Sequence, residues 1–222
     1  MRDYLWLYQH AVEQKGGAEV LEALLPSPKT AVELVQLSDS LYLSALCRRV
    51  FRAGLKHSMV DEKWPAFEKE FFGFSPEKLV LISDEMLEQA MQNKKLIRHW
   101  GKIKSIRQNA QMVQEVSEVN RGFGRFLVDW PERDLLGLWR YLAREGSQLG
   151  GNSAAYFLRM VGKDTFILTR DVVAALIAQG IIQKHPTTRG DLAAVQYAFN
   201  KWREQSDRPF CQLSLMLAFC VG

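Results

Sequence analysis

Helix signals follow one another along almost the whole chain, whereas the alternating apolar and polar pattern of a half-buried strand is scarce. Tyr4, Tyr8 and Val12 lie at helical spacing before the pair Gly16-Gly17, and they predict a first helix that ends there. Further helices are predicted over about residues 41–51, after the caps Ser75 and Ser83, from Trp130-Pro131, over 192–203 behind Thr188, and after Pro209. The sequence therefore predicts an all-α fold in which residues 1–222 form one bilobal unit, with two helical lobes around a cleft.

Composition narrows the class of protein without naming an activity. The chain has 222 residues, of which 47% are hydrophobic, and this is enough for one compact core or two small lobes. Its net charge of +4 suits a modest attraction to nucleic acid, although many unrelated proteins share this value. Three cysteines without a paired spacing favour a reducing cytosol, and the longest apolar run, Leu213–Val221, is about half as long as a membrane span. We expect a soluble, cytoplasmic protein that does not enter a membrane.

Residues 149–173 combine a glycine-rich bend, an apolar helix and an acid. Gly150-Gly151 can adopt backbone conformations closed to other residues, and the helix predicted from Ser153 has an N-terminal dipole that favours phosphate. Further on, Thr169 is a candidate N-cap, which would place Asp171 in the first turn of the next helix. The order predicts a phosphate grip followed by a catalytic carboxylate. The alternative is an ordinary helical corner followed by an acid that only complements the helix dipole.

The segment from Gln89 to Gln114 is rich in cations and contains no acid. At helical spacing Lys95, Arg98 and Lys102 share one side, while Trp100 and Ile103 fall toward another. This pattern predicts a basic face that contacts nucleic-acid phosphates and an apolar face that packs on the core. A solvated charged face is the alternative.

The bend and the acid also match a known pattern. A hairpin of the form Leu-Pro-Gly-Val-Gly, two residues and Thr-Ala, followed further on by an aspartate, is typical of the helix-hairpin-helix DNA glycosylases. On that pattern Gly150 takes the second glycine, Ser153-Ala154 the Thr-Ala pair and Asp171 the aspartate, while Gln148 replaces the first glycine and Ser147 the proline. Residues 146–173 therefore resemble this superfamily.

A second match lies upstream and narrows the resemblance. Ala53-Gly54-Leu55, Phe74-Ser75-Pro76 and the block 96–110 are similar, in order and spacing, to motifs of the bacterial 3-methyladenine DNA glycosylase I family. Together the matches cover roughly residues 40–176. The resemblance implies a monomeric repair enzyme of the cytoplasm, at the bacterial nucleoid, whose partner is duplex DNA containing a damaged base, here expected to be an alkylated purine.

Two positions of the family's base pocket differ in this chain. The family carries a glutamate four residues before its Ala-Gly-Leu and a tryptophan four residues after the alanine, and this chain has Arg49 and His57 there. A cation in place of an acid should repel a positively charged alkylpurine. Tyr156 is a third base-pocket candidate, because related alkylbase glycosylases place a tyrosine at the matching point, with core packing as its alternative role.

The resemblance also implies a mechanism. Breaking an N-glycosidic bond builds positive charge on the sugar, and Asp171 would stabilise this charge and orient the attacking water. Asn152 stands where bifunctional relatives carry a lysine, which implies base release without strand cleavage. No cofactor is expected, and the positions of Cys47, Cys211 and Cys220 predict neither the family's zinc site nor an iron–sulfur cluster. The candidate DNA-binding residues are Gly150, Gly151, Asn152, Ser153, Arg98 and Lys102.

Two alternatives to an enzyme remain open from the sequence. The chain could be a non-catalytic DNA-binding module that kept the glycosylase fold. It could also be a helical interaction protein in which Asp171 is only a helix-terminus acid.

Overall fold

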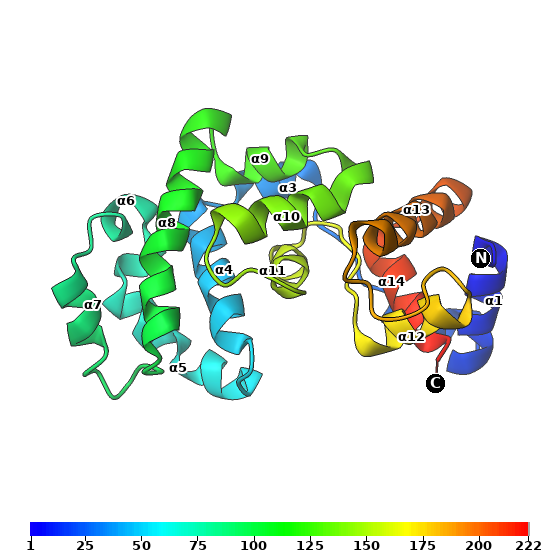
Figure 1. Ribbon diagram of the computed structural model, residues 1–222, viewed down its shortest axis with the longest axis horizontal. Coiled ribbons are helices and arrows are strands. Elements are labelled where there is room, and N and C mark those ends of the chain that lie inside the picture. Colours follow the sequence, from blue (N-terminus) through cyan, green and yellow to red (C-terminus); the bar gives the residue numbers. More distant parts are fainter. Residues whose placement is uncertain (222) are drawn as a thin grey trace. The chain divides into compact units, whose positions relative to one another are not determined.

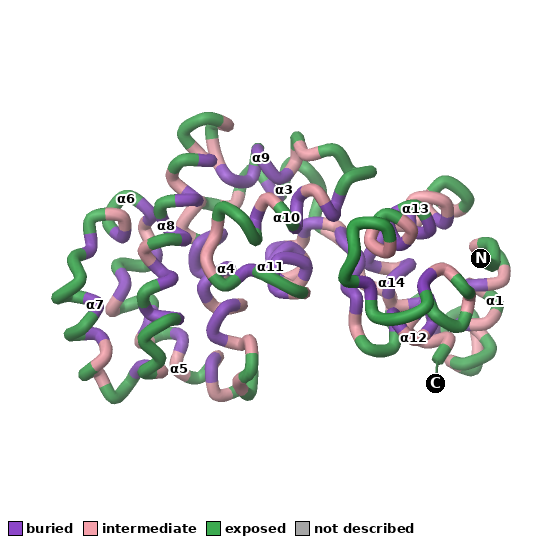
Figure 2. Tube along the Cα trace, viewed as in Figure 1, coloured by how far each residue is buried: buried purple, intermediate pink, exposed green. Residues whose placement is uncertain are grey.

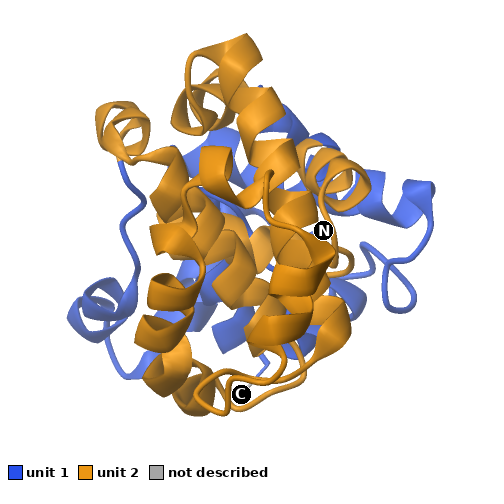
Figure 3. Cartoon of the chain, turned by 90° about the vertical axis from the view of Figure 1, so that its left-hand side faces the viewer, with its two compact units in different colours: residues 1–29, 131–137, 162–222 blue, residues 30–130, 138–161 orange. Residues whose placement is uncertain are grey.

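The computed structural model describes residues 1–221, and over these residues all regular secondary structure is helical, with no strand (Figure 1). The prediction of an all-α fold is confirmed. By its internal contacts the chain divides into two compact units (Figure 3): unit 1 comprises residues 1–29, 131–137 and 162–222, and unit 2 comprises residues 30–130 and 138–161. Each unit is therefore assembled from segments that are distant in the sequence.

Unit 1 carries the helix on which Asp171 lies, and the half-buried carboxylate of Asp164 precedes that helix in the chain. Asp164 accepts hydrogen bonds from the backbone N–H groups of Phe210 (2.8 Å) and Cys211 (2.9 Å) and from Nη1 of Arg203 (3.1 Å). It thereby satisfies donors at the start of the last helix. The helices of unit 1 are α1 (Tyr4–Lys15), α2 (Ala18–Leu24), α12 (Arg170–Ala178), α13 (Arg189–Ser206) and α14 (Phe210–Phe219), with the short 3-10 helix η2 (Glu132–Asp134).

The core of unit 1 is aromatic. The rings of Phe166 and Phe199 stack with their centres 4.2 Å apart, and Trp202 and Phe210 pack on them edge-on. All four side chains are buried. Since Phe166 belongs to the segment that leads into α12, this packing anchors that segment to the core of unit 1.

Unit 2 is built around two long helices, α4 (Asp39–Arg52) and α8 (Trp100–Asn120), which pack against each other. Helix α11 (Ser153–Val161) packs on α4, and buried positions concentrate along α4, α8 and α11 (Figure 2). The other elements are α3 (Ala31–Gln36), α5 (His57–Glu70), η1 (Phe72–Phe74), α6 (Pro76–Leu79), α7 (Asp84–Ala90) and α9 (Phe123–Asp129). Helix α10 (Leu135–Glu145) starts within residues assigned to unit 1 and ends in unit 2.

Most of the predicted helix starts are found, and Ser75, Ser83 and Thr188 all occupy N-cap positions. Ser83 accepts a hydrogen bond from the backbone N–H of Met86 (3.3 Å), and Thr188 accepts one from Asp191 (3.1 Å). Ser75 does not cap through its side chain, because its hydroxyl instead donates to the carboxylate of Glu77 (2.7 Å). Pro76 occupies the first helical position there and lacks an N–H that would need a cap.

Candidate active site

Asp171 lies where the sequence predicts it, in the first turn of α12. Thr169 is the N-cap, with an extended backbone, and its hydroxyl accepts a hydrogen bond from the N–H of Val172 (3.2 Å). Asp171 is exposed, while Val172 and Val173 are buried beside it. The cap and the packing together present this carboxylate at the surface of unit 1 on a fixed helix end.

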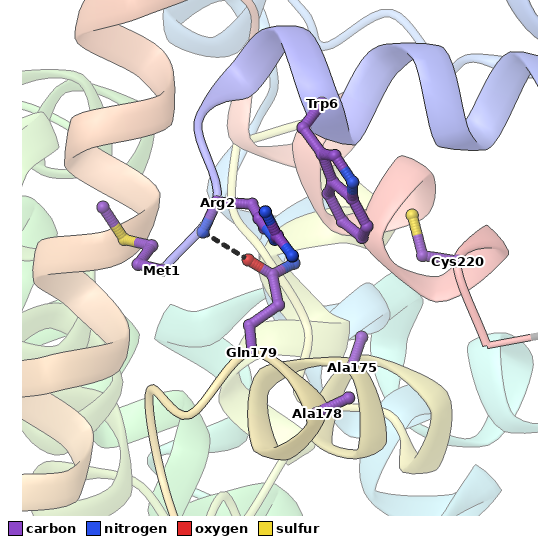
Figure 4. Close-up of a pocket in the computed structure, with 7 residues that line it drawn as sticks. All are labelled: Met1, Arg2, Trp6, Ala175, Ala178, Gln179 and Cys220. Atoms are coloured by element: carbon purple, nitrogen blue, oxygen red, sulfur yellow. Dashed lines mark hydrogen bonds between the residues drawn. The ribbon is translucent and has the colours of Figure 1, made fainter.

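The pocket at the other end of α12 is a separate feature. Ala175, Ala178 and Gln179 line it together with Met1, Arg2, Trp6 and Cys220, and its volume is about 580 Å³ (Figure 4). The backbone N–H of Arg2 donates to the side-chain oxygen of Gln179 across it (3.1 Å). Asp171 does not line this pocket, and the helical rise places it roughly 10 Å along the axis from Ala178. The pocket therefore does not hold the reacting atoms in a mechanism centred on Asp171.

The glycine-rich bend lies in unit 2, between α10 and α11. Gln148 and Gly151 have left-handed backbones, with φ of +62° and +57°, whereas Gly150 lies outside that region. The backbone N–H of Ser153 donates to the carbonyl of Gly150 (3.1 Å) and closes the turn. Within residues 1–221 the N–H groups of Gly150 and Gly151 donate to no protein atom, and both residues are exposed. Two backbone donors are therefore available beside the start of α11, as an anion-binding turn requires.

Two side chains that the sequence analysis did not assign to the site hold this bend in place. Asn109 is fully buried on α8; its Oδ1 accepts from the N–H of Ser147 (2.7 Å) and its Nδ2 donates to the carbonyl of Ser147 (3.2 Å). Gln148, which replaces a glycine of the pattern, donates from Nε2 to the carbonyl of Gly101 on the same helix (2.6 Å). The detectable sequence signal for Asn109 was a polar residue between the apolar positions Ile106 and Ala110 of α8.

The two glycines of the bend should respond differently to alanine. Gly151→Ala forces a Cβ into the left-handed region and should lower the free energy of unfolding by about 1 kcal/mol. Gly150→Ala meets no atom within 4 Å and keeps an ordinary φ, so it should be neutral or slightly stabilising. Urea denaturation of both variants measures the difference. Equal losses in the two variants would show that the left-handed turn does not form as described.

Arg49, Ser153 and Tyr156 come together between α4 and α11. Nη2 of Arg49 lies 3.5 Å from the hydroxyl of Ser153, and its guanidinium carbon lies 4.5 Å from the centre of the Tyr156 ring. Burial, and to a smaller extent the charge of Arg52, lowers the pKa of Arg49 against the opposing effect of Tyr156. His57 is the exposed first residue of α5 and makes none of these contacts. The structure thus brings together two of the three predicted base-pocket residues.

Lys102 is not a DNA-facing residue, and the predicted basic face is wrong in this respect. Its side chain is only 7% exposed, and Nζ donates to the carbonyls of Phe51 (3.1 Å) and Ala53 (2.5 Å) at the end of α4. These carbonyls lack helical donors, and the buried ammonium satisfies them. Burial, followed by the charge of Arg49, lowers the pKa of Lys102.

The segment 89–114 is also not one helix. Helix α7 ends at Ala90, and α8 begins at Trp100, where His99 is the N-cap and accepts a hydrogen bond from the N–H of Lys102 (3.3 Å). Arg98 therefore precedes the helix and is exposed, and Trp100 is 40% exposed instead of packing in the core. The helical phase on which the basic face was predicted does not extend across this break.

Salt dependence of duplex binding separates the two cations. Arg98→Met should reduce the slope of log affinity against log salt by about one, because it removes a proposed phosphate contact. Lys102→Met should leave the slope unchanged and lower the free energy of unfolding by about 1–2 kcal/mol, because two buried carbonyls lose their donor. Fluorescence anisotropy with a labelled duplex over a series of salt concentrations gives both slopes. A reduced slope for Lys102→Met would show that its ammonium reaches DNA.

The described residues offer neither a metal site nor a membrane span. No group of three or more His, Cys, Asp or Glu side chains within 1–221 is arranged to hold a metal ion. Cys47, Cys211 and Cys220 form no disulfide, and the first two are buried. Over the same residues, no helix is both long enough and apolar enough to cross a bilayer.

The chain is all-helical, with a glycine-containing bend before α11 and, in the first turn of the threonine-capped helix α12, an aspartate. This is the architecture of a helix-hairpin-helix DNA glycosylase. Comparison with known families gives the same answer, since a model of the methyladenine glycosylase family matches residues 35–187. The match covers more than half of the chain and includes both the bend and Asp171. This chain belongs to the methyladenine glycosylase family.

Solved structures agree with this fold. A 3-methyladenine DNA glycosylase I is similar with a TM-score of 0.50 and 21% identity, over 71% of this chain and 88% of that one. A variant of 3-methyladenine DNA glycosylase I in complex with 3-methyladenine gives a TM-score of 0.53 and 20% identity over 60% and 82% of the chains. The Methanocaldococcus jannaschii 8-oxoguanine glycosylase/lyase in complex with DNA containing 8-oxoguanine gives a TM-score of 0.54 and 16% identity, over 96% of each chain. No curated protein matches the chain in a sequence search.

Proposed function

We propose that this protein is a monofunctional DNA glycosylase of base-excision repair, which hydrolyses the N-glycosidic bond of a damaged purine flipped out of duplex DNA. Alkylated purines are the first class of substrate to consider, because the chain belongs to the methyladenine glycosylase family. The observation that carries the proposal is that the family match includes Asp171, which the fold presents as an exposed carboxylate on a capped helix.

The chemistry follows from where charge develops. A purine inside a duplex must leave the base stack before its glycosidic bond can be reached. As that bond breaks, the sugar acquires positive charge, and the carboxylate of Asp171 would stabilise it and orient the attacking water. Asn152 lies at the end of the bend and offers no amine for a covalent intermediate with the sugar, which supports base release with the strand left intact.

The bend in unit 2 is the proposed DNA grip. Gly150 and Gly151 contribute backbone donors, and Asn152 and Ser153 lie at the start of α11, where the helix dipole favours a phosphate. Arg98 adds an exposed cation. Arg49, Tyr156 and His57 remain the proposed base-pocket residues.

A non-catalytic DNA-binding protein with the same fold is the second candidate. The observation that favours it is Arg49, a cation at the position where the 3-methyladenine DNA glycosylase I family carries a glutamate. Such a protein would bind duplexes through the bend and Arg98 and release no base from any of them.

Base release from defined duplexes tests the proposal. Oligonucleotide duplexes that each contain one alkylated or oxidised purine are incubated with the protein at low salt, and free bases are separated by chromatography. We expect release of at least one damaged base, with strands that remain uncut until alkali is added. Duplex binding without release from any of these substrates would support the non-catalytic candidate.

A further inference from the structure

The guanidinium of Arg49 is a donor without its full set of acceptors. Its Nε atom is buried and has no hydrogen-bond partner among residues 1–221. Its one side-chain contact with an acceptor is the long one, 3.5 Å, to Ser153. A buried N–H that lacks a partner is costly, so this atom marks a place where a ligand acceptor would be favoured.

No carboxylate offsets the charge of Arg49. Within residues 1–221 Arg49 forms no ion pair, and Asp61 on α5 is engaged by Arg48 (2.9 Å) and Arg52 (2.6 Å). The charge of Arg52 acts on Arg49, and the charge of Arg49 in turn acts on Lys102. The surroundings of Arg49 are therefore positive, and a second fixed cation placed there would be repelled.

Tyr156 adds a flat surface to this donor. Its ring lies under the guanidinium at 4.5 Å, and both side chains are partly exposed. An aromatic ring beside a directed donor fits a planar heterocycle with an acceptor on its edge.

We infer that Arg49 determines substrate class: the site takes an uncharged purine lesion that presents a carbonyl acceptor, and rejects a purine that carries a fixed positive charge. This inference rests on the proposed function and narrows it. Arg49 contacts the acceptor edge of the base and acts on specificity, whereas Asp171 acts on the bond that breaks.

A DNA phosphate could satisfy the same donor, and the burial of Nε argues against it. Phosphates of a bound duplex stay at the protein surface, where this unit already offers the exposed donors Gly150, Gly151 and Arg98. A phosphate contact and a base contact of Arg49 also differ in salt dependence, because only the phosphate contact releases counterions.

The test compares lesions that differ in charge. Binding is measured in an Asp171→Asn background, so that turnover does not interfere. Each duplex contains one lesion: 7-methylguanine, which is cationic, or hypoxanthine or 8-oxoguanine, which are neutral and carry carbonyls. Release from the same duplexes is measured with native Asp171. We expect the neutral lesions to be preferred by at least about tenfold. Arg49→Glu should reverse this preference, so that the cationic lesion binds better, and Arg49→Gln should reduce the preference. Arg48→Gln, which removes a charge from the same helix, should leave the preference unchanged.

Each outcome bears on a different statement. Equal or better binding of the cationic lesion by the native side chain would overturn the role of Arg49 and leave the proposed function intact. If neutral lesions bind preferentially but no base is released from any duplex, the role inferred for Arg49 is supported and the proposed function is refuted. A salt slope that falls by about one in Arg49→Gln would show a phosphate contact instead and overturn the inference. Thermal unfolding identifies any variant that fails to fold, and Arg49→Gln then replaces Arg49→Glu as the deciding comparison.

Discussion

Asp171→Asn should lower the rate of base release by roughly 100- to 1,000-fold, because it removes the charge that would stabilise the developing cation on the sugar. The substitution keeps the size of the side chain and the Thr169 cap, so duplex affinity and unfolding should change little. Single-turnover release on a lesion duplex, measured with enzyme in excess, isolates this step from product release.

Asp191→Asn is the matched control. Asp191 is also a first-turn acid of a long helix of unit 1, behind a threonine cap, Thr188. Any general effect of losing an acid near a helix N-terminus is about 0.3–1 kcal/mol of stability and is shared by both variants. Release that falls equally in the two variants, or that persists unchanged in Asp171→Asn, would exclude Asp171 as the catalytic carboxylate.

Asn109→Ala should lower the free energy of unfolding by about 2–4 kcal/mol, because the N–H and the carbonyl of Ser147 both lose a buried partner. The bend that follows Ser147 should lose its fixed position, so we also expect weaker duplex binding with an unchanged salt slope. Urea denaturation and anisotropy measure the two effects separately. Asn109 is thus a positioning residue for the proposed DNA grip.

Asn120→Ala provides the comparison on the same helix. Asn120 donates to the carbonyl of Val116 within the last turn of α8 (2.7 Å), a local contact at a partly exposed site. Its loss should cost about 1 kcal/mol or less and leave DNA binding unchanged. Asn109→Ala with duplex affinity equal to that of Asn120→Ala would mean that the bend does not depend on α8.

The sequence alone determined what depends on neighbours in the chain. The helix over residues 4–15 ends at Gly16 as the apolar spacing and the glycine pair predict. Thr169 caps α12 and places Asp171 in its first turn, because an N-cap needs only a side-chain oxygen and an N–H two or three residues away. Motif order was enough to predict the family, since the matched residues do not have to be placed in space to be compared.

Only the tertiary structure decided the roles of Lys102, Asn109 and Arg49. Lys102 looks like a surface cation, yet its ammonium ends at the carbonyls of Phe51 and Ala53, about fifty residues earlier in the chain. Asn109 reaches Ser147, 38 residues away, and Arg49 reaches Tyr156 across the packing of α4 and α11. Helix spacing states which side chains share a face, but burial and the unsatisfied donors and acceptors of distant segments decide which face turns inward.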